Sequence, residues 1–445
     1  MKRSYNMLEG SLWDKIFFFS LPLAASSILQ QLFNAADSAV VGRFAGSEAL
    51  AAVGANTPVV SLFINALVGL SIGANVVIAQ YIGANDTKRI NQTIQTSILF
   101  SLISGIFVGI VGLFLADFIL LAIGTPDNVI ELASLYLRIY FVGLPFISLF
   151  NFGSAILRSS GDTKRPMYCL IIAGILNVLL NLLLVIVFKL SVAGVAIATV
   201  TSNIVSSTMI VYLLVQEKEI IHLDIKKICI DKCALIKILK TGAPASLQSM
   251  VFSLSNVCLQ SGVNSFGSQA IAGSATSTSF ELFDYFMVNA FNQAAVTFIG
   301  QNYAAKKFDR CKKIYKICMI EALIGILLME GLFLTGKDIF IGLYTQDAEV
   351  ASYATIRMYH CVLPHFLMCS YEITGSIMRG MGYSLLPALL TVIGSVGFRL
   401  AWLFIVFPYF HTFDMLLNVY PISWILTGIM VITAYFITAK KAYRI

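Results

Sequence analysis

The sequence contains twelve long apolar runs separated by short polar segments, and this succession limits the possible folds more than any other feature. Most runs reach the 20 or so residues that an α-helix needs to cross a bilayer. They lack the alternation of apolar and polar residues that the strands of a membrane barrel require. We therefore predict an all-α polytopic membrane protein with twelve transmembrane helices, near residues 16–38, 50–80, 92–116, 130–151, 167–188, 192–215, 243–265, 270–301, 314–335, 350–372, 385–408 and 417–438.

Charged residues are scarce and lie mostly between these runs. Asp, Glu, Lys and Arg make up 12% of the 445 residues, about half the share in ordinary soluble domains, so a soluble fold is excluded. The net charge of +7 does not indicate nucleic-acid binding, because the basic residues do not gather on a soluble, base-reading face. We assign 24 of the 30 Lys and Arg residues to loops on the side of the termini. Since basic loops stay in the cytoplasm, we expect a multi-pass protein of the cytoplasmic (inner) cell membrane with both termini cytoplasmic.

The two halves of the chain resemble each other. Matching positions lie 221 residues apart: 46–51 (GSEALA) with 267–272 (GSQAIA), Gln80 with Gln301, Arg158 with Arg379, and Gly161 with Gly382. We predict an N-terminal six-helix lobe at 1–215, a charge-rich cytoplasmic linker at 216–241, and a C-terminal six-helix lobe at 242–445. Because six is an even number, the two repeats run parallel and leave a central cleft that rocking opens to either side.

Polar residues inside the apolar runs of the first half are candidates for function, because burying them in a membrane is costly. Asp37 lies deep in the first run; the alternative is an acid at the outer helix end paired with Arg43. Asn177 and Asn181 are four residues apart and share one helix face. Thr199 lies in the next run. For the two asparagines and Thr199, the competing interpretation is hydrogen bonding that merely holds helices together.

The second half carries more ionisable residues inside its runs. Glu281, Glu372 and Arg399 have apolar residues on both sides, which marks them as functional candidates. The alternative is that these three face one cavity and neutralise one another. The candidates for a substrate cleft are Glu281, Asp284, Glu372, Arg399, Phe283, Phe286 and Met287.

Two acids and two histidines receive structural interpretations. Glu321 and Glu330 are predicted near the ends of their run and solvated. His360 and His365 are five residues apart, so they diverge around a helix and do not form a two-ligand metal site. Each is predicted to be a hydrogen-bonded interior histidine.

Motifs for other energy sources and for catalysis are missing from the sequence. It has no GxxxxGK[ST] phosphate-binding loop and no HExxH. We therefore expect a transporter and not an enzyme, without a cofactor, whose energy comes from a proton or sodium gradient. An embedded carboxylate suits that role, since a proton and a sodium ion can exchange at one such group.

Several motifs resemble those of the multidrug and toxic compound extrusion (MATE) transporters. They are DSAVVGR at 37–43, ALAAVG at 49–54, QYIGA at 80–84, LRSSGDT at 157–163 and GQN at 300–302. The resemblance covers essentially the whole chain, including the division into two six-helix halves. It implies a cation-coupled antiporter that exports organic, often cationic and amphipathic compounds through a cleft between two lobes.

The resemblance is to the prokaryotic DinF-like branch more than to the NorM-like branch, because the seventh run contains no Asp or Glu. It implies a coupling site, for a proton or for Na⁺ at Asp37, made of Asp37, Tyr136, Asn177, Asn181 and Thr199. Where that branch often has an acid, this chain has Asn181. One carboxylate is left instead of two, which favours proton coupling over sodium.

Two other functions stay open. A lipid-linked precursor flippase of the same superfamily would carry a strongly basic cavity, and a membrane-embedded enzyme would need a converging acid and base or metal cluster. The expected partners are small organic substrates, H⁺ or Na⁺ and the lipid bilayer, with no nucleic acid, and the protein is expected to be a monomer.

Overall fold

A computed structural model describes residues 6–218 and 220–443 of the chain. Within these ranges the chain forms helices joined by turns, without a strand. Nine helical segments of the described chain are long and apolar enough by themselves to cross a membrane. Three further long segments, at 232–264, 268–304 and 348–380, complete the set of twelve. The predicted fold of an integral membrane protein with twelve helices is confirmed.

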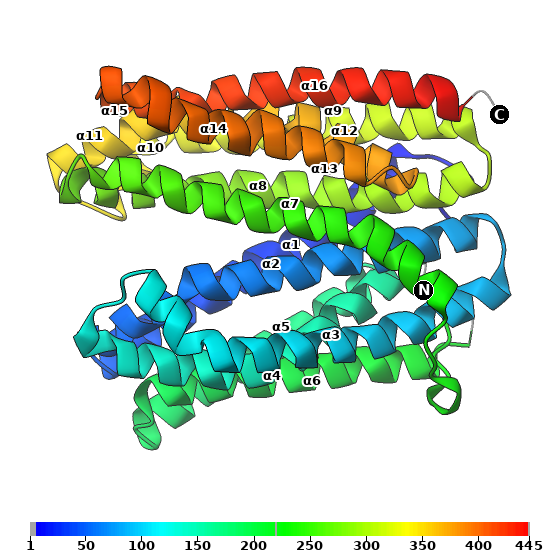
Figure 1. Cartoon of the computed structure of the whole chain (residues 1–445), viewed down its shortest axis with the longest axis horizontal. Coiled ribbons are helices and arrows are strands. Elements are labelled where there is room, and N and C mark those ends of the chain that lie inside the picture. The colour runs from blue at the N-terminus through cyan, green and yellow to red at the C-terminus, as the bar shows by residue number, and fades with distance from the viewer. Residues whose placement is uncertain (1–5, 219, 444–445) are drawn as a thin grey trace. The chain divides into compact units, whose positions relative to one another are not determined.

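The helices fall into two compact units (Figure 1). Unit 1 comprises Ala25–Ser246, and unit 2 comprises Met7–Ala24 together with the chain from Leu247 onward. The helices of the first half are α1 (Trp13–Phe44), α2 (Ser47–Gly83), α3 (Thr87–Ala122), α4 (Asp127–Ser159), α5 (Lys164–Asn181), which continues as the π-helical turn Leu182–Val187, and α6 (Ser191–Gln216).

The second half begins with α7 (Lys232–Asn264), which starts inside the segment predicted as a linker. It is followed by α8 (Ser268–Ala304), α9 (Phe308–Thr335) and the short α10 (Lys337–Gly342). The three last spans are each interrupted. They consist of α11 (Ala348–Arg357) and α12 (Cys369–Gly380), then α13 (Leu385–Thr391) and α14 (Phe398–Ala401), then α15 (Phe413–Leu417) and α16 (Val419–Ala442). Among them lie π-helical turns at Met358–Val362, Val392–Gly397 and Trp402–Val406.

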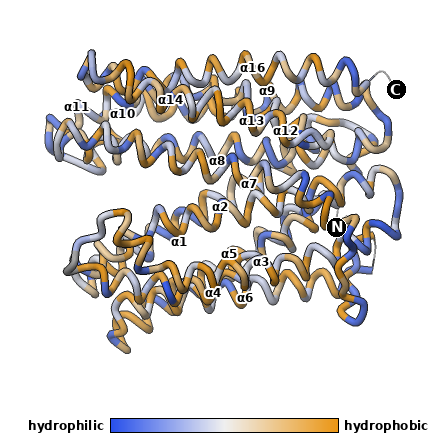
Figure 2. Tube along the Cα trace, viewed as in Figure 1, coloured by the Kyte–Doolittle hydropathy of each residue, from blue (hydrophilic) through white to orange (hydrophobic). Residues whose placement is uncertain are grey.

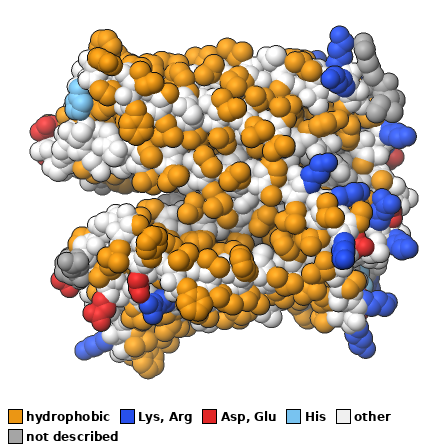
Figure 3. Space-filling model, viewed as in Figure 1, with side chains coloured by type: hydrophobic (Ala, Val, Ile, Leu, Met, Phe, Trp, Pro, Cys, Tyr) orange, Lys and Arg blue, Asp and Glu red, His pale blue; other side chains and the backbone are white. Residues whose placement is uncertain are grey.

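Apolar residues run along the helices, and hydrophilic ones concentrate in the turns at their ends (Figure 2). Figure 3 shows apolar side chains over the long sides of the helices and most of the visible Lys and Arg at one end of each unit. Large apolar side chains such as Phe114 (84% exposed) and Phe404 (70% exposed) point outward. An exposed apolar surface of this kind fits lipid rather than water. Lys2, Arg3 and Arg444, which entered the topology prediction, lie outside the described residues.

The backbone of the turns repeats between the halves. Gly46 and Gly267, which precede α2 and α8, have φ angles of 94° and 92°. Asn85 and Lys306, in the turns after those helices, have φ angles of 57° and 59°. Left-handed backbone is uncommon outside glycine, so its recurrence at equivalent positions shows that the repeat in sequence is also a repeat in structure.

α1 and α7 each contribute to both units. The first part of α1 packs in unit 2, where the Phe19 and Phe298 rings meet edge to face with centroids 5.5 Å apart. Arg310 holds the chain just before α1 by donating to the Gly10 carbonyl at 2.8 Å. The first part of α7 packs in unit 1, up to Ser246. Each helix passes from one unit to the other two residues after a proline, Pro22 in α1 and Pro244 in α7.

Glycines on α2 bring this helix close to the first part of α7. A Cβ atom on Gly73 would lie 2.3 Å from the Ile238 carbonyl oxygen, and one on Gly69 would lie 2.3 Å from the Ser246 Cα. Ser246 donates across the same contact to the Ala66 carbonyl at 2.8 Å. Small residues therefore let these two backbones approach, as they do in other membrane helix pairs.

Candidate functional site

Four of the five residues predicted for the coupling site form one chain of hydrogen bonds in unit 1. The Asn181 side-chain amide donates to the Asp37 carboxylate. The same Nδ2 atom lies 3.4 Å from Asn177 Oδ1, and Asn177 Nδ2 lies 3.4 Å from Thr199 Oγ1. This chain of hydrogen bonds thus connects α1, α5 and α6.

The end of α5 places the two asparagines. Their spacing of four residues puts both side chains on one face, where Asn177 is 6% and Asn181 1% exposed. Directly after Asn181 the helix widens into the π-helical turn Leu182–Val187. Such turns frequently occur at functional sites. Asn181 Oδ1 is buried and accepts no hydrogen bond from the described residues, so an unused acceptor lies beside the carboxylate.

Two stacked tyrosines of α4 complete this group. The rings of Tyr136 and Tyr140 are nearly parallel, with centroids 6.0 Å apart, and both side chains are buried. Both hydroxyl groups are close enough to Asp37 to interact with it electrostatically. The sequence singled out Tyr136 and missed Tyr140, although the spacing of four residues was a signal that the two share a face.

The alternative interpretation of Asp37, an ion pair with Arg43, is wrong for the described structure. Asp37 bonds to Asn181 instead. The Arg43 guanidinium lies 6.0 Å from the centroid of the Phe44 ring. No ion pair joins Asp37 to Arg43 in the described part of the chain.

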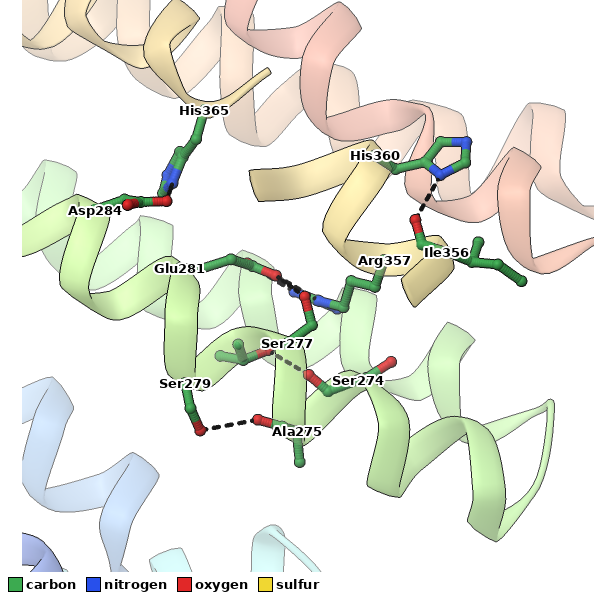
Figure 4. Close-up of polar contacts among 11 residues, drawn as sticks. Ser274, Ala275, Ser277, Ser279, Glu281, Asp284, Ile356, Arg357, His360 and His365 are labelled. Carbon is green, nitrogen blue, oxygen red and sulfur yellow. Dashed lines mark hydrogen bonds and ion pairs between the residues drawn. The ribbon is translucent and has the colours of Figure 1, made fainter. Parts of the chain in front are cut away.

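In unit 2, Glu281 of α8 has a partner that the sequence did not predict. The carboxylate forms a two-pronged ion pair with Arg357 of α11, at 2.7 Å to Nε and 3.1 Å to Nη2 (Figure 4). Side-chain exposure is 15% for Glu281 and 6% for Arg357. The suggested mutual neutralisation of Glu281, Glu372 and Arg399 is therefore wrong. The sequence held one signal for this partner, because Arg357 is an arginine inside an otherwise apolar run.

Glu372 and Arg399 are held by other groups. Glu372 accepts a hydrogen bond from Asn292 at 2.9 Å. Arg399 is 1% exposed and donates to Ser423 Oγ at 3.1 Å. Its guanidinium lies 4.7 Å from the centroid of the Tyr420 ring, so ring electrons provide part of its counter-charge.

Asp284 and Glu330 are buried within unit 2. Asp284 is 0% exposed and faces His365, whereas His360 points elsewhere and bonds to the Ile356 carbonyl at 2.9 Å (Figure 4). Glu330 is 3% exposed, so the prediction that it is solvated is wrong. Its carboxylate accepts from the Phe366 backbone N–H at 2.7 Å. The helix ends at Thr335 as predicted, but Glu330 lies more than one turn before that end, on the buried face that it shares with Ile326 and Phe333. Glu321 of the same helix is 8% exposed, so the prediction that it is solvated is wrong as well.

The three apolar residues predicted to line the substrate cleft belong to α8 in unit 2. Phe283 contacts Phe333, with ring centroids 5.9 Å apart, and Phe286, at 6.4 Å. Met287 packs against the core of the unit and against Gly325. These three residues stay predictions as substrate contacts.

The chemistry available at the Asp37 group is that of one carboxylate among amide and hydroxyl groups. No cluster of three or more His, Cys, Asp or Glu suited to a metal ion occurs among the described residues. The group can bind a proton at the carboxylate, and Asn181 can bond to either protonation state because its amide carries both a donor and an acceptor.

The MatE family model matches the chain twice, at residues 22–183 and 244–405, once in each half. The probable multidrug resistance protein YoeA of Bacillus subtilis is 28% identical, over 90% of this chain and 88% of that protein. The multidrug export protein MepA of Staphylococcus saprophyticus is 24% identical, over 85% of this chain and 81% of that protein.

Solved structures have the same fold. A MOP superfamily transporter from Pyrococcus furiosus superimposes with a TM-score of 0.92 at 22% identity, covering 100% of both chains. A multidrug resistance MATE family transporter in an outward-facing conformation superimposes with a TM-score of 0.88 at 23% identity, covering 100% of this chain and 98% of that one.

Proposed function

Since the chain belongs to the MatE family, we propose that it is a secondary active antiporter that exports amphipathic organic compounds, often cationic ones, in exchange for protons. The names of its relatives YoeA and MepA, which refer to multidrug resistance and multidrug export, support the class of substrate. The protein lies in the cell membrane with both termini in the cytoplasm. The distribution of its basic residues supports this orientation.

The proposal of proton coupling rests on Asp37 and the residues that are hydrogen-bonded to it. Asp37 is the single carboxylate in a chain of hydrogen bonds that continues through Asn181, Asn177 and Thr199. When Asp37 is ionised, the Asn181 amide donates to it. When Asp37 is protonated, its hydroxyl can donate to the Asn181 oxygen after a turn of the amide, so both states have a partner.

A ligand can drive a conformational change only by binding two states with different affinity. The proton is that ligand here. It removes the charge of a largely enclosed carboxylate and changes the bonds that tie α1 to α5. Sodium coupling is the competing form of this function, and it would use the same carboxylate.

Proteoliposomes that report the export of a cationic dye test the proposal. We expect export to follow an imposed pH gradient and Asp37→Asn to abolish it while the protein stays folded. Glu48→Gln is the matched control, because Glu48 is an exposed acid in the first turn of α2. Export driven by a sodium gradient alone, or normal export by Asp37→Asn, would overturn the proposal.

A further inference from the structure

A buried carboxylate in unit 2 lacks the hydrogen bonds that such a group needs. Asp284 of α8 is 0% exposed, and neither of its oxygens has a hydrogen bond of good geometry within the described chain. The His365 imidazole faces it, with Nδ1 3.5 Å from Asp284 Oδ2 (Figure 4). His365 is 6% exposed, and its Nδ1 has no hydrogen bond of good geometry either. Burying polar groups in this way is costly unless a proton or partner satisfies them.

The helices around Asp284 contribute further titratable groups. Glu330 of α9 interacts electrostatically with Asp284 and accepts from the Phe366 N–H. Cys369 of α12 also interacts electrostatically with Asp284. Glu372 lies further along α12 and is bonded to Asn292. On α8 itself, Glu281 is neutralised by Arg357.

Once the Glu281–Arg357 pair is set aside, two acids and one histidine share this enclosed space: Asp284, Glu330 and His365. If both acids are ionised, a charged His365 leaves a net charge of −1 and a neutral His365 leaves −2. The group is neutral only when His365 is charged and one acid is protonated, or when His365 is neutral and both acids are protonated. An uncompensated buried charge is strongly unfavourable, so the group must hold protons and can release them.

We propose that Asp284, His365 and Glu330 form a proton-binding site of unit 2, separate from Asp37 in unit 1. The ligand is a proton, which a carboxylate and an imidazole nitrogen 3.5 Å apart can share. The three residues titrate as one coupled group, with the proton distributed among them. This inference goes beyond the proposed function and does not depend on which compound is exported.

The structure supplies a reporter for this proton. The Trp424 ring of α16 stacks on His365, with centroids 5.0 Å apart and planes 23° from parallel. A charged imidazole quenches the fluorescence of a stacked indole. The chain has three tryptophans, so Trp13→Phe with Trp402→Phe leaves Trp424 as the only one.

In this single-tryptophan protein, purified in detergent, we expect fluorescence to fall in a step as the pH is lowered from about 9 to about 5. His365→Gln should remove the step. Asp284→Asn should move its midpoint toward acid by at least about one pH unit, because the imidazolium loses its counter-charge. His360→Gln is the matched control and should leave the step intact, because His360 faces the Ile356 carbonyl.

A flat fluorescence profile in the parent single-tryptophan protein would overturn the inference without any variant of the cluster. A step that persists in folded His365→Gln, or an unchanged midpoint in folded Asp284→Asn, would overturn it as well. Asp37→Asn should keep the step. A step that is present while export ignores a pH gradient would refute the proposed function and leave this site standing.

Discussion

Asn181 donates its side-chain amide to the carboxylate of Asp37, a residue 144 positions earlier in the chain. The bond ties the end of α5 to the second part of α1 within unit 1. An amide in this place leaves Asp37 as the only acid of the hydrogen-bonded group. The choice between amide and acid at position 181 therefore sets how many positive charges the group can bind.

We predict that Asn181→Asp makes export respond to sodium. Two carboxylates in contact repel each other unless a proton or cation lies between them. In dye-loaded proteoliposomes, an inward sodium gradient should stimulate export by the variant and not by the parent protein. Asn151→Asp, which adds an acid to α4 where the amide donates to the Ile147 carbonyl, is the control. Equal indifference of both variants to sodium would contradict the prediction.

Removing one partner of the Glu281–Arg357 ion pair should lower the stability of the protein more than replacing both partners with apolar residues. Glu281→Gln leaves a buried guanidinium without its counter-charge, which costs about 3 to 5 kcal/mol. The double variant Glu281→Leu/Arg357→Met should recover most of that loss. Thermal unfolding of the detergent-solubilised proteins measures both. A double variant less stable than Glu281→Gln would show that the pair itself is strongly stabilising.

Gly73 and Gly54 of α2 offer a matched comparison of packing. A Cβ atom on Gly73 would meet the Ile238 carbonyl oxygen at 2.3 Å, whereas one on Gly54 would have no heavy atom within 4 Å. Gly73→Ala should lower stability by about 1 to 3 kcal/mol through overpacking. Gly54→Ala should be neutral or slightly stabilising, because alanine favours helix. Equal melting temperatures for the two variants would argue against the close approach of α2 and α7.

Labelling of two native cysteines tests the proposed orientation of the protein in the membrane. Cys229 lies between α6 and α7, and Cys233 lies in the first turn of α7. Both are exposed, whereas Cys169, Cys311 and Cys318 are buried. A membrane-impermeant maleimide should label inside-out vesicles and not right-side-out ones. Cys229→Ser/Cys233→Ser should lose the label. Labelling only of right-side-out vesicles would place this segment outside the cell and reverse the topology.

The fold could be predicted from the sequence because its signals are local. The length of each apolar run indicates a membrane-spanning helix, and the repeated Gly46 and Gly267 mark turns that require left-handed backbone. The interruptions of the last spans were not predicted. Hydropathy is insensitive to one extra residue in a helical turn, so the π-helical turns at Met358–Val362 and Val392–Gly397 leave no trace in it.

The candidate sites were harder to predict, because partners far apart in the chain are chosen by packing. A charge in an apolar run marked Glu281 as unusual, but Arg357, 76 residues away, became its partner through the contact of α8 with α11. The grouping of Asp37 with Tyr136 and Thr199 came from the family resemblance and not from spacing. Asp284 and His365 were both noticed, but not as neighbours.

The division of α1 and α7 between the units bears on whether either repeat can fold alone. Ala24 and Ser246 end the first parts of the two helices, at equivalent places in the two repeats, and each first part packs in the unit that holds most of the other repeat. Each repeat therefore places its first half-helix in the unit that holds most of the other repeat, as the chains of a domain-swapped dimer do. Neither repeat would then be a foldable fragment on its own. Cutting the chain after α6 should give two pieces that accumulate only when produced together.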